Sequence, residues 1–203
     1  MRQGAREIQA QTTIDFIVKE SFRLFAKKRY EQVTVTDMER ATKLTRGSIF
    51  YYLKNKEHLF EKILEKYIFN QNFTSNCDRK TLLSFINSFV DQIKSNKELM
   101  NSLGIKNADF AYTNISNQAV YFYPEYISII KEKNEKELIT WVEVVQSAIL
   151  SGEISNSANT DTVANIFYHL YAGFSYNGIL LPDGIDLEKM HNAFMEIYNM
   201  IKK

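Results

Sequence analysis

Cysteine, proline and glycine are all scarce in this chain. Its 203 residues include one cysteine, two prolines and seven glycines. The single cysteine, Cys77, can form neither an internal disulfide nor a cysteine-rich metal site. Because few residues interrupt helices, and Lys, Glu, Ile and Leu are frequent, the composition predicts an all-α protein.

Long hydrophobic runs, metal-binding spacings and catalytic motifs are also missing. No run of about 18 apolar residues predicts a membrane span, and the first residues are too polar for a secretory signal. We therefore expect a cytoplasmic protein without membrane contact. His58, His169 and His191 lack the spacing of a metal site, and no phosphate loop, dinucleotide fingerprint or nucleophile motif occurs. The sequence thus predicts no metal, no cofactor and no enzymatic activity.

Charge is distributed unevenly along the chain, although the net charge is only +1. Residues 1–66 hold 14 Lys and Arg against 9 Asp and Glu, a net of +5, and the remainder carries −4. A basic amino-terminal third is typical of a nucleic-acid-binding domain. A chance excess of five charges is the alternative.

Apolar residues at helical spacing and capping residues predict four helices in the first third. These are a helix over 12–28 (Thr12 with Asp15), one from Asp37 (capping box Thr36 and Glu39), one capped by Thr45 that ends at Tyr52, and one capped by Asn55.

A polar stretch at 70–78 indicates a boundary, which divides the chain into a DNA-binding domain, 1–68, and a second domain, 69–203. In the second domain we expect a helix from Leu82, irregular structure with short helices over 97–123, and a long helix over about 125–150 that ends at Gly152. We also expect a helix capped near Thr160 and a last helix after Asp186. The run from Glu135 to Glu143 is interpreted as a solvated helix face.

Residues 37–52 have the pattern of a helix–turn–helix, in which the second helix enters the major groove. Its apolar residues can face the core while Thr45, Arg46, Ser48 and either Phe50 or Tyr51 project outward. Arg binds guanine edges, hydroxyls bind bases or phosphates, and Gly47 allows close backbone approach. Lys54 and Lys56 are predicted to contact phosphate.

The runs 25–30, 33–38, 44–51 and 54–60 together resemble the amino-terminal domain of the TetR family of bacterial transcriptional regulators. The resemblance implies a helical homodimer, with a carboxy-terminal domain that binds a small molecule and forms the dimer interface. By position it assigns DNA contacts to Thr36, Thr45, Arg46, Gly47, Ser48, Tyr51 and Lys56.

Arg29 and Lys43 depart from the family pattern, because glycine is usual at both positions. A non-glycine residue there implies a different turn or strain on the order of 1 kcal/mol. The departures put the operator sequence in doubt and leave the fold intact.

The second domain offers candidates for a ligand pocket and a dimer interface. The alternative for both sets is core packing within one chain. The candidate pocket residues are Phe110, Tyr112, Tyr123, Trp141, Tyr168 and His169. The last two helices, one with a heptad seam, predict a four-helix interface. Its candidate residues are Phe167, Tyr171, Phe174, Met190, Phe194, Ile197 and Ile201.

The sequence therefore predicts a DNA-binding transcriptional regulator. We expect a ligand-responsive repressor that binds a palindromic operator in double-stranded DNA as a homodimer. The alternative is a DNA-bound protein of the same fold that acts through a protein partner, for example in cell division.

Overall fold

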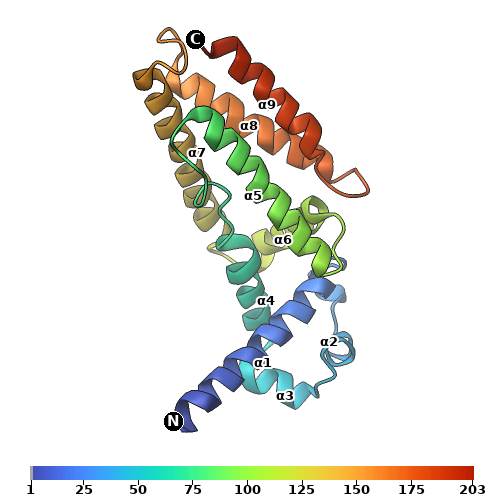
Figure 1. Ribbon diagram of the computed structural model, residues 1–203. Helices are drawn as coiled ribbons and strands as arrows, with labels where there is room; N and C mark the ends of the chain where they lie inside the picture. Colours follow the sequence, from blue (N-terminus) through green and yellow to red (C-terminus); the bar gives the residue numbers. More distant parts are fainter. Residues whose placement is uncertain (1) are drawn as a thin grey trace. The chain divides into compact units, whose positions relative to one another are not determined.

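The computed structural model describes residues 2–203 and confirms the all-α prediction (Figure 1). The β contact within these residues is one isolated antiparallel bridge between Ile154 and Lys202. The α-helices, with a 3₁₀ helix (η1) and a π-helix (η2), are α1 (Arg2–Phe25), η1 (Tyr30–Gln32), α2 (Val35–Thr42), α3 (Arg46–Leu53), α4 (Lys56–Leu64), η2 (Glu65–Phe69), α5 (Leu82–Ser102), α6 (Ala108–Phe122), α7 (Tyr126–Ser151), α8 (Thr160–Gly178) and α9 (Leu187–Ile201).

Several helix starts are as predicted. The side chains of Thr45, Asn55 and Asp186 accept backbone N–H groups at the starts of α3, α4 and α9. Each cap satisfies one of the donors that a helix leaves unpaired at its first turn. Gly152 adopts φ 77° directly after α7, as expected for a helix end.

The start of α2 was predicted at the wrong residue. Thr34 is the N-cap, and it forms a capping box with Asp37: the Asp37 N–H donates to Thr34 Oγ1, and the Thr34 N–H donates to the Asp37 carboxylate. Thr36 lies inside the helix and is exposed. Two overlapping Thr-x-x-acid patterns occur here, Thr34 with Asp37 and Thr36 with Glu39, and the first of them forms the cap.

Two further boundaries differ from the prediction. Helix α1 begins well before Thr12, whose hydroxyl donates to the Ile8 carbonyl within the helix. The irregular structure expected over 97–123 is instead the end of α5 and the regular helix α6. Gly104, at φ 73°, turns the chain after α5. The apolar periodicity of this segment is weak because three of the four buried apolar residues of α6, Ala108, Ala111 and Ala119, are alanines, and Ile115 is the fourth.

Contacts divide the chain into two compact units. The first unit comprises Met1–Gln71 and Ala111–Ile127, and the second comprises Asn72–Phe110 and Ser128–Lys203. The polar stretch predicted as a boundary therefore contains the change between units at residue 71. The first unit also includes most of α6, which the division at residue 68 assigns to the second domain. Division into independent domains at residue 68 stays a prediction.

The core of the first unit is largely aromatic. The Tyr30 ring stacks on Phe122 at 4.2 Å between centroids and contacts Phe60 edge-on at 5.1 Å. The Asn114 amide donates to the Phe25 carbonyl at 2.9 Å. These contacts join the ends of α1 and α6 to η1 and α4. They provide the support on which the helix–turn–helix rests.

The second unit has its own core, built around Trp141 on α7. Its indole ring is fully buried, stacks on Phe167 of α8 and meets Phe85 of α5 edge-on at 4.6 Å. Phe194 of α9 closes the cluster at 5.4 Å from Phe167. One aromatic cluster thus joins the four long helices of this unit.

The corner between α8 and α9 is fastened to the start of α6. The buried Asp109 carboxylate accepts the Ser175 hydroxyl and, at 2.7 Å, the Ile185 N–H. The Asn107 amide donates to the carbonyls of Gly178 and Leu181. This packing leaves no room for a side chain at Gly178: a Cβ there would lie 2.6 Å from Ile185 N and 2.7 Å from Asp109 Oδ2.

Gly178→Ala is therefore expected to destabilise the protein, because backbone and a hydrogen-bonded carboxylate must move to accommodate the methyl group. We expect a loss of roughly 1–3 kcal/mol in the free energy of unfolding, measured by urea denaturation at one protein concentration. The neighbouring exposed Asn177→Ala is the control and should change it by less than about 0.5 kcal/mol. Equal effects of the two substitutions would show that the corner is loosely packed.

Candidate nucleic-acid interface

Helix α3 presents a polar, exposed side that begins at its first turn. Ile49 and Leu53 are buried in the first unit, as is Met38 of α2. Ala41 and Leu44 are partly buried, so the apolar side of the motif faces the core as predicted. The exposed side chains are those of Thr45, Arg46, Ser48 and Tyr51, with Gly47 between them and Phe50 half-buried.

The exposed residues of α3 differ in how freely their side chains can reach a ligand. Tyr51 is 81% exposed. Thr45 Oγ1 lies 3.0 Å from Ser48 Oγ and also accepts the Ser48 N–H, so these hydroxyls hold one another. A Cβ atom at Gly47 would lie 4.0 Å from Thr45 Oγ1, so even a side chain would meet no close contact there. The helix start is therefore open to close approach by another molecule.

Glu39 of α2 is a site residue that the sequence analysis did not identify. Its Oε1 accepts the backbone N–H of Arg46 at 2.7 Å. A carboxylate at a helix N-terminus interacts favourably with the helix dipole. The bond ties the start of α3 to α2. From the sequence, Glu39 was expected to form a capping box with Thr36. No pattern of neighbouring residues indicates its hydrogen bond with Arg46, which lies seven residues further along the chain.

Arg29 and Lys43, where the family usually has glycine, adopt different backbone conformations. Lys43 adopts the left-handed conformation, φ 59° and ψ 19°, in which a side chain is strained by about 1 kcal/mol. Arg29 has ordinary extended backbone, φ −68° and ψ 153°. Of the two expected alternatives, strain is found at Lys43, and a turn without positive φ is found at Arg29, which directly precedes η1.

Lys54 carries a further backbone feature that the sequence does not predict. Its φ is 56° and its ψ is −64°, and the next N–H, of Asn55, donates to the Leu53 carbonyl at 2.6 Å. This is a γ-turn of the rare, strained type. It joins α3 to α4 within two residues. The Lys54 side chain is exposed, as its predicted phosphate contact requires.

Lys56 is directed into the first unit. Its ammonium donates to the Tyr30 carbonyl and lies 4.2 Å from the centre of the Tyr30 ring. Burial lowers the pKa of Lys56, while the charges of Glu31 and Glu57 oppose that change. Burial also raises the pKa of Tyr30 to about 12, with a further contribution from Glu57. In this conformation Lys56 fastens α4 to η1, and a phosphate contact requires that bond to open.

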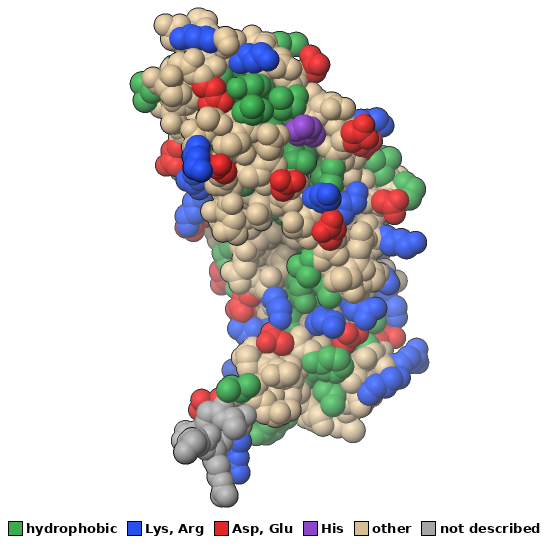
Figure 2. All heavy atoms as spheres, in the orientation of Figure 1, with side chains coloured by type: hydrophobic (Ala, Val, Ile, Leu, Met, Phe, Trp, Pro, Cys, Tyr) green, Lys and Arg blue, Asp and Glu red, His purple; other side chains and the backbone are tan. Residues whose placement is uncertain are grey.

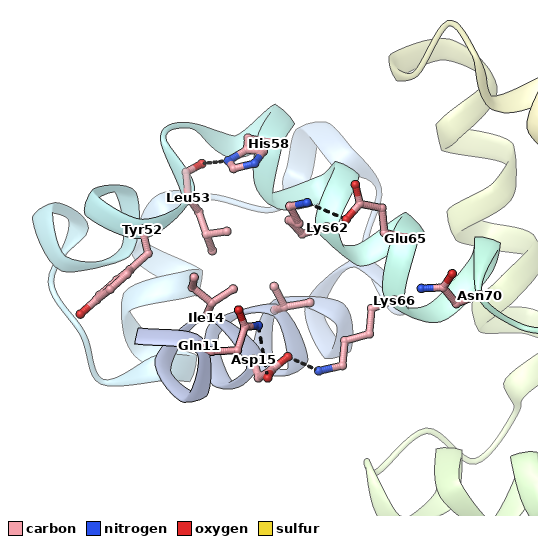
Figure 3. A pocket seen from close by; sticks show the side chains of 11 residues that line it. Gln11, Ile14, Asp15, Tyr52, Leu53, His58, Lys62, Glu65, Lys66 and Asn70 are labelled. Atoms are coloured by element: carbon pink, nitrogen blue, oxygen red, sulfur yellow. Dashed lines mark hydrogen bonds and ion pairs between the residues drawn. The ribbon is translucent and has the colours of Figure 1, made fainter. Parts of the chain in front are cut away.

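A cleft of about 300 Å³ in the first unit lies between α1 and α4–η2 (Figure 3). Its charged groups are paired: Lys66 with Asp15, and Lys62 with Glu65. His58 Nδ1 lies 3.0 Å from the Leu53 carbonyl. The hydrogen bond to Lys66 lowers the pKa of Asp15. The Lys66–Asp15 pair joins η2 to α1, whereas the His58 contact joins α4 to the end of α3 and the Lys62–Glu65 pair joins neighbouring turns of α4 and η2.

The six candidate pocket residues fall into both compact units. Tyr112 and Tyr123 belong to the first unit, and Phe110, Trp141, Tyr168 and His169 to the second. Phe110 and His169 are exposed, whereas Trp141 is fully buried in the aromatic core. Their assignment to one ligand pocket stays a prediction.

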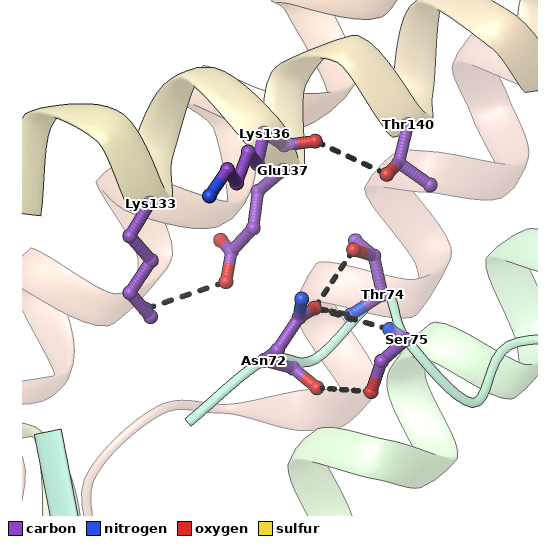
Figure 4. Close-up of polar contacts among 7 residues, drawn as sticks. All are labelled: Asn72, Thr74, Ser75, Lys133, Lys136, Glu137 and Thr140. Atoms are coloured by element: carbon purple, nitrogen blue, oxygen red, sulfur yellow. Dashed lines mark hydrogen bonds and ion pairs between the residues drawn. The ribbon is translucent and has the colours of Figure 1, made fainter. Parts of the chain in front are cut away.

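A buried carboxylate on α7 was missed by the sequence analysis. Glu137 is only 5% exposed, and its Oε1 lies 3.3 Å from Lys133 Nζ (Figure 4). Burial raises the pKa of Tyr168, and the charge of Glu137 raises it further. The interpretation of 135–143 as a solvated face is therefore wrong at Glu137, because this residue follows the buried side of α7 that continues to Trp141.

The predicted dimer residues are only partly available to a second chain. Phe167, Met190 and Phe194 are fully buried within one chain, so their assignment to an interface is wrong. The heptad seam of α9 is real, but it packs against α5 and α8 of the same unit. Tyr171, Phe174, Ile197 and Ile201 are partly buried against that core.

Within residues 2–203, no three His, Cys, Asp or Glu side chains are grouped as a metal site requires. None of the described helices is long and apolar enough to cross a membrane.

On the face drawn in Figure 2, basic and acidic side chains are interspersed. This face therefore carries no continuous basic patch.

Comparison with known proteins identifies relatives of the first unit. A family model described as bacterial regulatory proteins of the tetR family matches residues 17–63, which include α2 and α3. The biofilm operon icaADBC HTH-type negative transcriptional regulator IcaR of Staphylococcus epidermidis is 24% identical over 137 residues, 58% of this chain and 74% of that protein.

Solved structures share the fold over nearly the whole chain. The SmeT–triclosan complex matches with a TM-score of 0.65 at 14% identity and covers 95% of this chain and 92% of that one. MexZ, a repressor responsible for antibiotic resistance in Pseudomonas aeruginosa, matches with a TM-score of 0.65 at 12% identity and covers 95% and 96%. At such identities the likeness shows the fold alone.

The cap of α2 generates a prediction about pH. Hydrogen bonds from the Thr34 backbone and from Lys28 lower the pKa of Asp37 from 3.8 to about 2. A depressed carboxyl pKa stabilises the fold above the unfolded value, and this stability is lost as the pH falls through the folded value. Asp37→Asn is thus expected to be less stable than wild type near neutral pH. The difference should shrink between about pH 4 and pH 2.

Urea denaturation of both proteins across this pH range provides the measurement. Asp183→Asn is the control, because Asp183 is exposed and its side chain forms no hydrogen bond or ion pair in the described structure. A stability difference between wild type and Asp37→Asn that stays constant from pH 7 to pH 2 would contradict the role of the Asp37 charge.

Proposed function

This chain belongs to the TetR family of bacterial transcriptional regulators, and we propose that it represses its target genes as a homodimer on a palindromic operator. We further propose that a small molecule bound by the second unit releases the DNA. IcaR is a negative transcriptional regulator, and this supports repression as the direction of control. Binding to chromosomal DNA in a bacterium implies a cytoplasmic location.

The observation that carries the DNA-binding proposal is the exposed start of α3. Arg46 and Ser48 are exposed at its first turn, Tyr51 follows one turn later, and the opposite side is buried through Ile49 and Leu53. A helix with this arrangement can enter the major groove while its apolar side stays in the core. Thr36, at the second residue of α2, and Lys54, after α3, are placed to contact the flanking backbone.

Arg46 is the proposed base-reading residue, because guanidinium groups bind guanine edges through two hydrogen bonds. Arg46→Ala should reduce affinity for the operator by roughly 1–3 kcal/mol and relax sequence preference at one position of each half-site. Selection from random duplex DNA with wild type and variant measures both, and the wild type should recover an inverted repeat.

Lys106→Ala, an exposed change in the second unit, is the control for loss of charge and should retain wild-type preference. An Arg46→Ala variant that selects the same sequence as wild type would remove Arg46 from base recognition. A wild-type protein that selects no sequence would contradict the proposed function itself.

The homodimer proposal is supported by an exposed stripe on the outer side of α8. Ile166, His169, Gly173 and Tyr176 follow one another at spacings of three, four and three, and all are exposed. Leu180, four residues further, is 82% exposed. A heptad spacing of this kind suits packing against the same stripe of a second copy. In α9, by contrast, the exposed residues Asn192, Glu196 and Asn199 are polar, and Met200, 79% exposed, is an exposed apolar residue near its end.

Tyr176→Asp should therefore give monomers, since it places a charge in the centre of an apolar contact without touching the buried core. Light scattering at several concentrations measures the mass in solution, and circular dichroism verifies the fold. Asn192→Asp on the outer side of α9 is the matched control and should remain dimeric. Dimers that persist in a folded Tyr176→Asp variant would place the interface elsewhere.

Helix α6 supports the proposal of a ligand response. It starts in the second unit, where Asn107 and Asp109 hold the α8–α9 corner, and continues through the first, where Asn114 is bonded to the end of α1. A ligand shifts such a protein only if it binds one arrangement more tightly than the other. SmeT, of the same fold, has been solved with triclosan, which supports a small aromatic molecule as ligand.

A further inference from the structure

The recognition helix α3 is bracketed by the two non-glycine residues of the described chain that have a positive φ. Lys43, at φ 59°, precedes α3, and Lys54, at φ 56°, follows it. Glycine adopts positive φ without the steric penalty that a Cβ imposes, and asparagine tolerates it better than other residues. Two strained residues at one functional element therefore call for an explanation.

The backbone at Lys43 does not itself require lysine. The Lys43 N–H donates to the Glu39 carbonyl at 2.8 Å and ends α2, a contact that any residue with an N–H can form. The side chain is exposed and forms no hydrogen bond or ion pair within the described residues. The strained position is thus occupied by a long cationic side chain with no role inside the protein.

Four other lysines of the first unit are bonded within the protein, whereas Lys27, which does not flank α3, is exposed and has no ion pair in the described structure. Lys28 is paired with Asp37, Lys62 with Glu65, and Lys66 with Asp15. Lys56 is bonded to the Tyr30 carbonyl. Their charges are partly satisfied internally. Lys43 and Lys54 are unpaired, exposed, and fixed in direction by tight turns at the two ends of α3.

We propose that Lys43 is a phosphate-binding residue and that, with Lys54, it anchors the DNA backbone on both sides of the recognition helix. This inference rests on the DNA binding proposed above. The left-handed backbone fixes the direction of the Lys43 Cα–Cβ bond next to the start of α3, and the exposed, flexible side chain can then reach a phosphate there. The conformational strain is retained because the charge at this position contributes to binding.

The test uses two substitutions that suit the left-handed backbone and remove the charge, Lys43→Asn and Lys43→Gly. Both should denature at a urea concentration equal to or higher than wild type. Both should weaken DNA binding by roughly threefold to tenfold at moderate salt and reduce the slope of log affinity against log salt by about 1.8, which is about 0.9 for the phosphate contacted by each subunit of the dimer. The loss should be similar for operator and non-operator DNA, as expected of a phosphate contact.

Lys43→Arg restores the charge and should restore the wild-type salt slope. Lys80→Asn removes an exposed lysine of the second unit and is the matched control for net charge. Unchanged affinity and slope in folded Lys43→Asn would overturn the proposal. A loss of stability in Lys43→Gly would do the same, because it would assign lysine a structural role at the turn.

These outcomes separate the inference from the proposed function. If wild type selects no operator sequence, the proposed function fails and no phosphate role remains for Lys43. If wild type selects an operator and the Lys43 variants bind it as wild type does, only the inference fails. Lys43→Asn combined with Lys54→Asn should reduce the slope by about 3.6, twice the single effect, because four phosphate contacts of the dimer are then lost.

Discussion

The packing of the Tyr30 ring is the interaction on which the DNA-binding unit depends. The ring stacks on Phe122 of α6, contacts Phe60 of α4, and lies near Phe25 at the end of α1. Its backbone carbonyl accepts the ammonium of Lys56. Three other helices, α1, α4 and α6, thus meet at this residue of η1, so the helix–turn–helix is supported from behind while its polar side remains open.

That open side is built under local strain. Lys43 and Lys54 hold positive φ at the two ends of α3, and the Glu39 carboxylate ties the helix start to α2. Short, strained turns fix the angle and position of a helix more closely than long flexible loops, because fewer dihedral angles are free. The stability that the turns give up is supplied by the buried aromatic contacts of Tyr30 and by apolar packing of Ile49 and Leu53.

Some apolar residues of the second unit fill its core, and others are exposed on α8. Trp141, Phe167 and Phe194 fill the core of one chain, and Asp109 fastens the corner between α8 and α9. The stripe on α8 that ends near Tyr176 remains exposed. Sequence periodicity identifies both kinds of residue as apolar at helical spacing. It cannot say which side of a helix covers its own core, because that depends on where the neighbouring helices lie.

The sequence by itself determined the helical class, the caps at Thr45, Asn55 and Asp186, and the polar side of α3, because these depend on residues a few positions apart. Only the tertiary structure decided the partner of Glu39, the burial of Glu137 and the inward direction of Lys56. Each of these depends on groups from another element or a later turn. Such contacts form when packing brings distant segments together, and no local pattern encodes them.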